Sequence, residues 1–267
     1  MKANEIKLND VNTFIRQKLF QEKLNPNTVN NIITVLMQII KYGENHGEID
    51  YFNYDVIKPA ASVKELEVLT EDEQKKLVNA IKPNITNENV GILLSLYTGL
   101  RIGEICALTW EDIDITAGTI YITKTLQRIS VPNKDTGSKT TVIIDTPKSH
   151  KSIRKIPVPD FLLTELKRLS FRCHVKSYVL TSSEARYTEP RAYQYKFKKY
   201  LKQAGIRNVN FNALRHTFAT RAIEQNVDIK SLSEILGHST VSFTLDKYVH
   251  PSFTTKKQSL QKLAVYY

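Results

Sequence analysis

The stretch LGHSTVSFTLDKYVH, residues 236–250, places a Gly-His pair ten residues before a tyrosine in a mostly polar segment. The chain has 13 tyrosines, so a special role for Tyr248 must come from the residues around it. A tyrosine hydroxyl becomes a nucleophile when its proton is removed beside groups that stabilise the charge of the reaction. Such groups are expected where charged side chains stand among apolar residues, because burying a charge is costly unless it is paired.

Three further stretches have this character. They are TGLRIGEICAL (98–108), TPKSHKSIRKIPV (146–158) and FNALRHTFATR (211–221). The first places Arg101 at an expected helix start, with Glu104 one turn on. The second places Lys148 at an expected bend between two strands, and the third places Arg215 three residues after Asn212.

Each of these residues alone has an ordinary structural explanation. Arg101 and Glu104 could form an i,i+3 ion pair, His238 could cap a helix, and Tyr248 could pack in the core. Together they share a chemical logic. Two arginines can bind a phosphodiester bidentately, a lysine can protonate a leaving oxygen, and a tyrosine can attack phosphorus. Such a site needs no metal, because its cationic groups stabilise the charge of the phosphate.

The ordered set of four stretches resembles the tyrosine recombinases, also called the phage integrase family, over about residues 6 to 260. The resemblance implies an enzyme that cuts and rejoins DNA at specific sites, with neither metal nor ATP nor another cofactor. It also implies a role for each matching residue. Arg101 and Arg215 would be the two phosphate-binding arginines, and Glu104 the acid that supports the first of them. Lys148 would donate a proton to the 5′ oxygen, and His238 would donate a hydrogen bond to the phosphate. Tyr248 would be the nucleophile that forms a 3′-phosphotyrosyl bond.

One position departs from the family's pattern. The family usually has a histidine three residues before the second arginine, where this chain has Asn212. An amide can hydrogen-bond a phosphate oxygen but cannot accept a proton near neutral pH. The general-base role toward Tyr248 would then be relaxed, moved to another group or left to water. His216 is expected to point to a different helical face and to lie outside the site.

The composition is typical of a soluble globular protein, with 41% hydrophobic and 24% charged residues. No apolar run approaches the roughly 20 residues that span a bilayer, and no signal peptide opens the chain, which predicts a cytoplasmic protein without a membrane partner. Cys106 and Cys173 lack metal-ligand spacing, and no HExxH, GxGxxG or P-loop is present. These absences argue against a metal- or nucleotide-driven enzyme.

The net charge of +11 is unevenly distributed. Residues 1–60 hold 7 basic and 7 acidic residues, whereas residues 124–207 hold 19 basic against 6 acidic ones. A local excess of this kind is typical of a surface that faces phosphates, although a solvated basic face without a partner would look the same. A helix near 190–204 supplies the residues expected to contact the DNA backbone: Arg191, Lys196, Lys198, Lys199 and Lys202.

The predicted fold class is mainly α with a small antiparallel β-sheet. Helices are expected over 9–20 and from Pro26, and a capping box of Thr70 and Glu73 predicts another helix after a linker. Three strands are expected at 119–125, 140–144 and 153–158, in one three-stranded sheet. The expected domains are a shortened helical core-binding (DNA-binding) domain at 1–60, a linker at 61–69, and a catalytic domain with a C-terminal helix at 70–267.

The resemblance implies double-stranded DNA as partner, a homotetramer on two DNA sites, and room for accessory DNA-bending proteins. The segment SFTTKKQSLQKLAVYY (252–267) would dock on a neighbouring protomer or simply close the core. The first 60 residues fit either a minimal member or a truncated chain. Two other functions remain open: strand passage like that of a type IB topoisomerase, and a DNA-binding accessory protein that has lost catalysis. Asn212 favours the latter, and the five intact catalytic positions argue against it.

Overall fold

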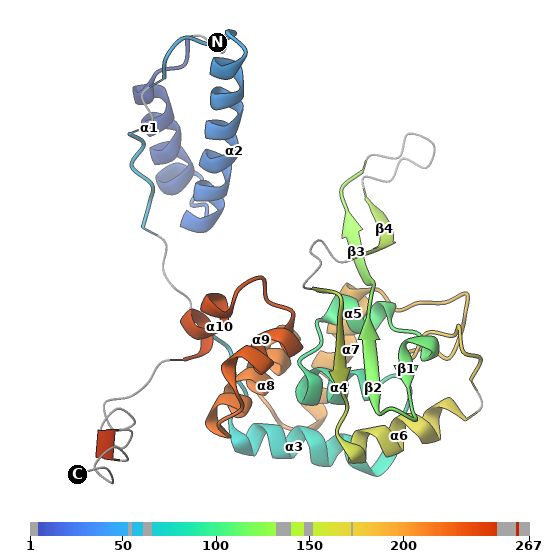
Figure 1. Ribbon diagram of the computed structural model, residues 1–267. Helices are drawn as coiled ribbons and strands as arrows, with labels where there is room; N and C mark the ends of the chain where they lie inside the picture. Colours follow the sequence, from blue (N-terminus) through green and yellow to red (C-terminus); the bar gives the residue numbers. More distant parts are fainter. Residues whose placement is uncertain are drawn as a thin grey trace. The chain divides into compact units, whose positions relative to one another are not determined.

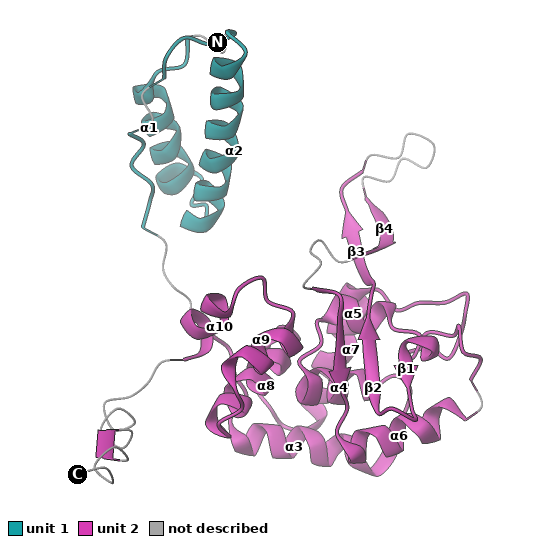
Figure 2. Cartoon of the chain, viewed as in Figure 1, with its two compact units in different colours: residues 1–65 teal, residues 66–267 magenta. Residues whose placement is uncertain are grey.

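The computed structural model (Figure 1) describes residues 5–52, 55–60, 66–131, 140–146, 152–171, 173–249 and 260–261. Lys148 therefore lies outside the described residues, as does the segment 252–267 apart from Leu260 and Gln261. The chain forms two compact units, Met1–Glu65 and Leu66–Tyr267 (Figure 2). Within the described parts of both units, no helix combines the length and the apolar character needed to cross a bilayer.

Unit 1 is a small helical hairpin. Helix α1 (Leu8–Arg16) continues into a π-helical turn, η2 (Gln17–Gln21), and α2 (Pro26–Asn45) returns after a short loop. The side chain of Asn25 accepts a hydrogen bond from the backbone N–H of Asn27, and Pro26 occupies the first helical position, where its missing N–H costs nothing. Apolar residues of both helices and the following segment form a small core of Val11, Ile15, Val29, Ile33, Ile40 and Phe52.

Unit 2 is mainly helical. Its α-helices are α3 (Glu71–Ile81), α4 (Val90–Thr98), α5 (Ile102–Ala107), α6 (Asp160–Ser170), α7 (Pro190–Gln203), α8 (Asn212–Glu224), α9 (Ile229–Leu236) and α10 (Val241–Tyr248), with two short 3₁₀ turns, η3 (Lys82–Asn84) and η4 (Trp110–Asp112). Thr70 and Glu73 form the predicted capping box, because each side chain accepts a hydrogen bond from the other residue's backbone N–H. This confirms the predicted start of α3.

The strands of unit 2 form two antiparallel sheets. They are β1 (Ile113–Asp114), β2 (Thr119–Ile122), β3 (Thr125–Ile129), β4 (Thr141–Asp145) and β5 (Arg154–Pro157). A three-stranded sheet has the order β1-β2-β5, with Ile120 opposite Ile156, and β3 pairs with β4 in a separate hairpin. The predicted sheet of 119–125, 140–144 and 153–158 was therefore wrong in its membership. The chain leaves β2 at Ile122 and starts a new strand at Thr125, and this new strand takes β4 as its partner.

The core of unit 2 lies between the three-stranded sheet and the helices around it (Figure 1). The predicted apolar face of α7 is confirmed, since Tyr193, Phe197 and Leu201 are all buried. Two helices of this unit end at glycines with a left-handed backbone: Gly99 after α4 (φ 69°) and Gly237 after α9 (φ 64°). Only glycine adopts this conformation without strain, and these two helix ends carry the carbonyl groups around which the site is built.

Candidate active site

Arg101 lies at the N-terminus of α5, where its extended backbone starts the helix. Its Nη1 donates to Glu104 Oε1 at 3.0 Å, and its backbone N–H donates to Oε2 of the same carboxylate at 2.9 Å. Its Nη2 donates to the carbonyl oxygen of Gly237 at 3.3 Å, which brings it to the end of α9. The side chain is 38% exposed, so the guanidinium can still reach a ligand from solvent.

Glu104 is held by a second arginine, Arg154, at the start of β5. Arg154 donates from Nη1 to Oε1 and from Nη2 to Oε2, both at 2.9 Å, in a bidentate pair. The two side chains are 6% and 3% exposed. Burial alone would raise the pKa of Glu104, but the hydrogen bonds and charges of Arg154 and Arg101 outweigh it and lower the pKa to about 2. Glu104 is therefore an anion that holds two arginines at neutral pH.

Arg215, on α8, is almost completely buried. Its Nη1 donates to the carbonyl oxygen of Gly99 and its Nη2 to that of Leu236, both at 2.7 Å. These carbonyls lie at the C-terminal ends of α4 and α9, where helix dipoles favour a positive charge. Burial, followed by the charges of Arg101 and Arg154, lowers the pKa of Arg215 to about 9, so its side chain remains charged at neutral pH.

His238 follows the glycine that ends α9. Its Nδ1 lies 2.8 Å from Thr244 Oγ1, and both side chains are buried. Burial and the neighbouring Arg215 and Arg101 lower the pKa of His238 to about 3, so the ring is neutral at pH 7. When the Thr244 hydroxyl donates to Nδ1, the proton of the ring lies on Nε2, where it can be donated to a phosphate oxygen.

Tyr248 is the last residue of α10 and is 8% exposed. Its ring is parallel to that of His238, with an interplanar angle of 6° and centroids 6.1 Å apart. Burial raises the pKa of the Tyr248 hydroxyl, while the charges of Arg215 and Arg101 act in the opposite direction. The predicted nucleophile therefore lies beside the predicted histidine and within the field of both predicted arginines.

The prediction that His216 lies outside the site was wrong. Its Nδ1 lies 2.8 Å from Tyr248 Oη, and its Nε2 lies 3.3 Å from Asn212 Nδ2. The face argument failed because α8 is buried on most sides, so that successive residues can each reach a different packed neighbour. Arg215 points to the ends of α4 and α9, and His216 points to α10.

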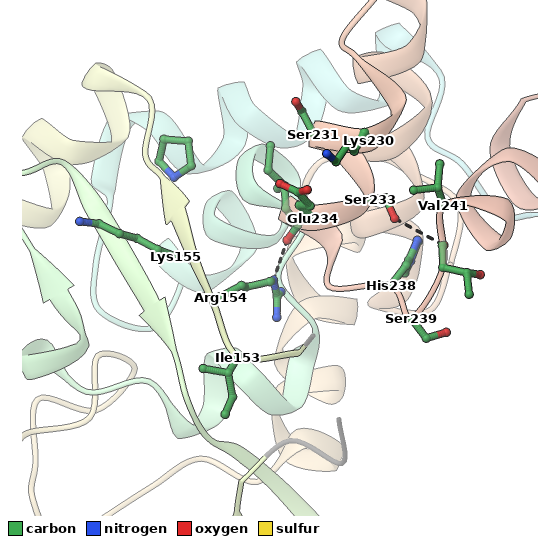
Figure 3. Close-up of a pocket in the computed structure, with 13 residues that line it drawn as sticks. Ile153, Arg154, Lys155, Lys230, Ser231, Ser233, Glu234, His238, Ser239 and Val241 are labelled. Atoms are coloured by element: carbon green, nitrogen blue, oxygen red, sulfur yellow. Dashed lines mark hydrogen bonds between the residues drawn. The ribbon is translucent and has the colours of Figure 1, made fainter. Parts of the chain in front are cut away.

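A pocket of about 630 Å³ opens beside these groups, between the start of β5 and the turn that joins α9 to α10 (Figure 3). Arg154 and His238 line opposite sides of it, and the Nε of Arg154 donates to the carbonyl oxygen of Ile235 at 2.6 Å. As for metals, the described residues include no group of three or more His, Cys, Asp or Glu that could hold an ion.

The structure thus brings together five of the residues predicted from sequence: Arg101, Glu104, Arg215, His238 and Tyr248. Asn212 reaches the site through His216. On α7, Lys196 forms an ion pair with Glu88, so its charge is partly used within the fold. The other predicted DNA contacts on this helix, Arg191, Lys198, Lys199 and Lys202, are exposed.

Sequence reasoning missed two residues, His216 and Arg154. A signal for Arg154 was present, because in β5 it shares a face with buried Ile156, and a charge on the apolar face of a strand requires a buried partner. No comparable signal marked His216, since its contact depends on how α10 packs against α8.

Comparison with known proteins shows the family to which the chain belongs. The model of the phage integrase family matches residues 67–255, and the chain therefore belongs to this family. A XerC-like tyrosine recombinase of Caldanaerobacter subterraneus subsp. tengcongensis is 27% identical over 267 residues, which cover 92% of this chain and 68% of that protein. With the XerA tyrosine recombinases of Thermococcus kodakarensis and Pyrococcus furiosus, the alignments cover 60% and 54% of the relative's length.

Solved structures share the fold. The Tn1549 transposon integrase in complex with transposon right end DNA has a TM-score of 0.78 at 23% identity, over 99% of this chain and 87% of that chain. The lambda integrase tetramer bound to a Holliday junction has a TM-score of 0.61 at 17% identity, over 91% of this chain and 65% of that chain. The predicted fold class, mainly α with a small antiparallel sheet in a tyrosine-recombinase catalytic domain, is confirmed.

Proposed function

We propose that the protein is a site-specific DNA recombinase that cuts and rejoins DNA strands through a 3′-phosphotyrosyl intermediate at Tyr248. The observation that carries the proposal is the convergence at residues 236–238. Arg215 binds the carbonyl of Leu236, Arg101 binds that of Gly237, and the ring of His238 is parallel to the Tyr248 ring. Two guanidinium groups and a neutral imidazole thus surround one tyrosine, which suits a phosphodiester substrate.

In this mechanism the two arginines hold the non-bridging oxygens of the scissile phosphate. Their positive charge stabilises the extra negative charge of the pentacoordinate transition state. His238 donates a hydrogen bond from Nε2 to the phosphate. The low pKa of His238 keeps its ring neutral at pH 7. Glu104 holds Arg101 in place by accepting a hydrogen bond from Nη1, and the bidentate pair with Arg154 holds Glu104 itself.

Cleavage then forms one bond and breaks one. Tyr248 Oη attacks phosphorus and loses its proton, and the P–O5′ bond breaks as the 5′ oxygen takes up a proton. We assign this second proton to Lys148, following the resemblance of its stretch to the family. The phosphotyrosyl ester retains the energy of the broken bond, so a 5′ hydroxyl can reverse the reaction on the same or another strand without ATP.

The proposed partner is double-stranded DNA, and the proposed working form is a homotetramer on two DNA sites. The basic stretch 124–207 supports phosphate binding by unit 2, and the fold is shared with lambda integrase, solved as a tetramer on a Holliday junction. Strand exchange between two sites would integrate, excise or invert DNA according to how the sites are arranged. Accessory DNA-bending proteins remain a prediction.

The test is covalent trapping. Wild-type protein and the Tyr248→Phe variant would be incubated with nicked duplexes that tile the DNA on either side of the gene, and separated on denaturing gels. A nick close to the cleavage position makes the released fragment, which carries the 5′ hydroxyl, short enough to diffuse away. The reaction then cannot reverse, so the covalent adduct accumulates. We expect an adduct with wild type and none with Tyr248→Phe. If the wild-type protein binds the duplexes but forms an adduct with none of them, the proposal is refuted.

A further inference from the structure

The hydroxyl of Tyr248 has a partner that the proposed function leaves without a role. His216 Nδ1 lies 2.8 Å from Tyr248 Oη, which is hydrogen-bond distance, and both side chains are buried. On the other side of the imidazole, the exposed Asn212 places its amide 3.3 Å from Nε2. The three side chains form a continuous chain from solvent to the nucleophile.

We propose that His216 is the group that accepts the proton of Tyr248 during cleavage and returns it during rejoining, and that Asn212 orients its ring. This inference rests on the proposed function. The order of the three residues is that of an orienting group, a base and a nucleophile, which recurs in enzymes that activate a hydroxyl or thiol. Asn212 cannot itself accept a proton near neutral pH, but in this arrangement it orients the residue that does.

The tautomer of His216 decides whether Nδ1 can accept a proton. When Asn212 Nδ2 donates to Nε2, the ring proton lies on Nδ1 and points at Tyr248 Oη. When the amide turns by half a rotation, Oδ1 accepts from Nε2–H and Nδ1 becomes an acceptor for the tyrosine proton. Asn212 is exposed and free to make this turn. In the second arrangement its carbonyl oxygen also stabilises the imidazolium that forms.

Burial and the nearby cations keep His216 neutral before DNA binds. Burial is the main cause of its lowered pKa of about 4, followed by the cations Lys247 of α10 and Arg215 of α8. The other groups that face it are the hydroxyl of Tyr248 and the amide of Asn212, and neither is charged at neutral pH. A DNA phosphate bound at Arg215 would offset these cations, which favours protonation of the ring when the proton of Tyr248 must leave.

As the Oη–P bond forms, the Oη–H bond breaks and its proton moves to Nδ1 of His216. In the same displacement the P–O5′ bond breaks, and the 5′ oxygen takes a separate proton from the acid on its side of the phosphate. Rejoining reverses both transfers, so His216 ends the cycle neutral.

The experiment compares wild type with His216→Ala and His216→Asn in single-turnover cleavage of the nicked duplex, from pH 6 to pH 9. Asparagine keeps an amide near the position of Nδ1 and can hydrogen-bond Tyr248, but it cannot accept a proton near neutral pH. It therefore separates holding the tyrosine from deprotonating it. His174→Ala removes an exposed histidine outside the site and serves as the matched control. The fluorescence of Trp110, the single tryptophan and part of the core of unit 2, verifies that each variant is folded.

We expect both His216 variants to cleave about 100-fold more slowly at pH 7, the usual effect of losing a general base. Their rates should rise about tenfold per pH unit, because hydroxide then removes the proton, whereas the wild-type rate should change little above pH 7. Added imidazole should restore part of the rate to His216→Ala and none to Tyr248→Phe.

Two outcomes would overturn the inference while leaving the proposed function intact. In one, the variants cleave at the wild-type rate with the wild-type pH profile. In the other, they are slow at every pH in parallel with wild type and imidazole has no effect, which would give His216 a packing role only. A wild type that forms no adduct dependent on Tyr248 would refute the inference together with the proposed function.

Discussion

Replacing Arg154 by methionine tests whether the buried ion pair with Glu104 holds the site together. Methionine keeps much of the apolar stem but leaves the Glu104 carboxylate, 3% exposed, without its bidentate partner. Removing one member of a buried pair costs about 3–5 kcal/mol, because the remaining charge is left without compensation. Arg101 would still bind both oxygens of Glu104, one through its guanidinium and the other through its backbone N–H. We therefore expect the lower end of this range, about 3 kcal/mol in the free energy of unfolding.

The assay is urea denaturation of the full chain, followed by fluorescence. The single tryptophan, Trp110, is buried in unit 2 and therefore reports on that unit alone. Arg128→Met is the matched control, because Arg128 also donates from two side-chain nitrogens, Nε and Nη2, to a carboxylate, that of Glu189. Both of these side chains are partly exposed, at 44% and 34%. An exposed pair is worth about 0–1 kcal/mol, so the control should lose little.

A double-mutant cycle sharpens the comparison. In the variant that combines Arg154→Met with Glu104→Leu, no charge of the pair remains to be left unpaired. The double variant should therefore be more stable than the sum of the two single changes predicts, by about 2 kcal/mol or more. A loss below about 1 kcal/mol in Arg154→Met, or a coupling within about 0.5 kcal/mol of zero, would contradict a buried pair that acts as one unit.

Three further outcomes are expected. In Lys148→Ala, cleavage should slow strongly on ordinary DNA. It should recover when the 5′ leaving oxygen is replaced by sulfur, because a thiolate leaves without a proton donor. Equal slowing on both substrates would exclude Lys148 as the acid. Gly237→Ala should lower the free energy of unfolding more than Gly205→Ala, because both positions have positive φ but a Cβ at Gly237 would lie 3.1 Å from Arg154 Cδ, whereas at Gly205 nothing lies within 4 Å; equal losses would refute the contact. Burial, with nearby cations, lowers the pKa of the two buried histidines from 6.5 to about 4 and about 3, so the unfolded chain binds protons first. The free energy of unfolding, measured in urea, should thus be constant between pH 6.5 and pH 8. It should fall by about 1 kcal/mol per histidine for each pH unit from pH 6.5 to pH 4, and a flat profile would contradict this.

The sequence predicted the parts of this molecule that depend on local signals. The capping box at Thr70 and the apolar face of α7 follow from spacing alone, and both are present in the structure. The residues of the site were named through four stretches whose order along the chain matches a family, and the structure gathers all those it describes. Lys148 lies outside the described residues, so its place in the site stays a prediction.

What the sequence could not predict depends on contacts between distant segments. β2 pairs with β5, whereas β4 pairs with β3. The choice of partner strand depends on contacts between distant segments, which no strand specifies alone. The contact of His216 with Tyr248 joins residues 32 positions apart, and no periodicity within α8 reports on it. The bidentate pair of Arg154 and Glu104 spans 50 positions and depends on how β5 is placed beside α5.

The anchoring of Arg215 has a consequence for the cell that makes the protein. Its guanidinium depends on carbonyls at Gly99 and Leu236, which lie 116 and 21 positions away in the chain. A chain still emerging from the ribosome, or one clipped by a protease before α9, lacks the second anchor and the tyrosine as well. Such incomplete products would be unable to carry out the proposed cleavage, because the nucleophile and the second anchor of Arg215 both lie in the last part of the catalytic unit.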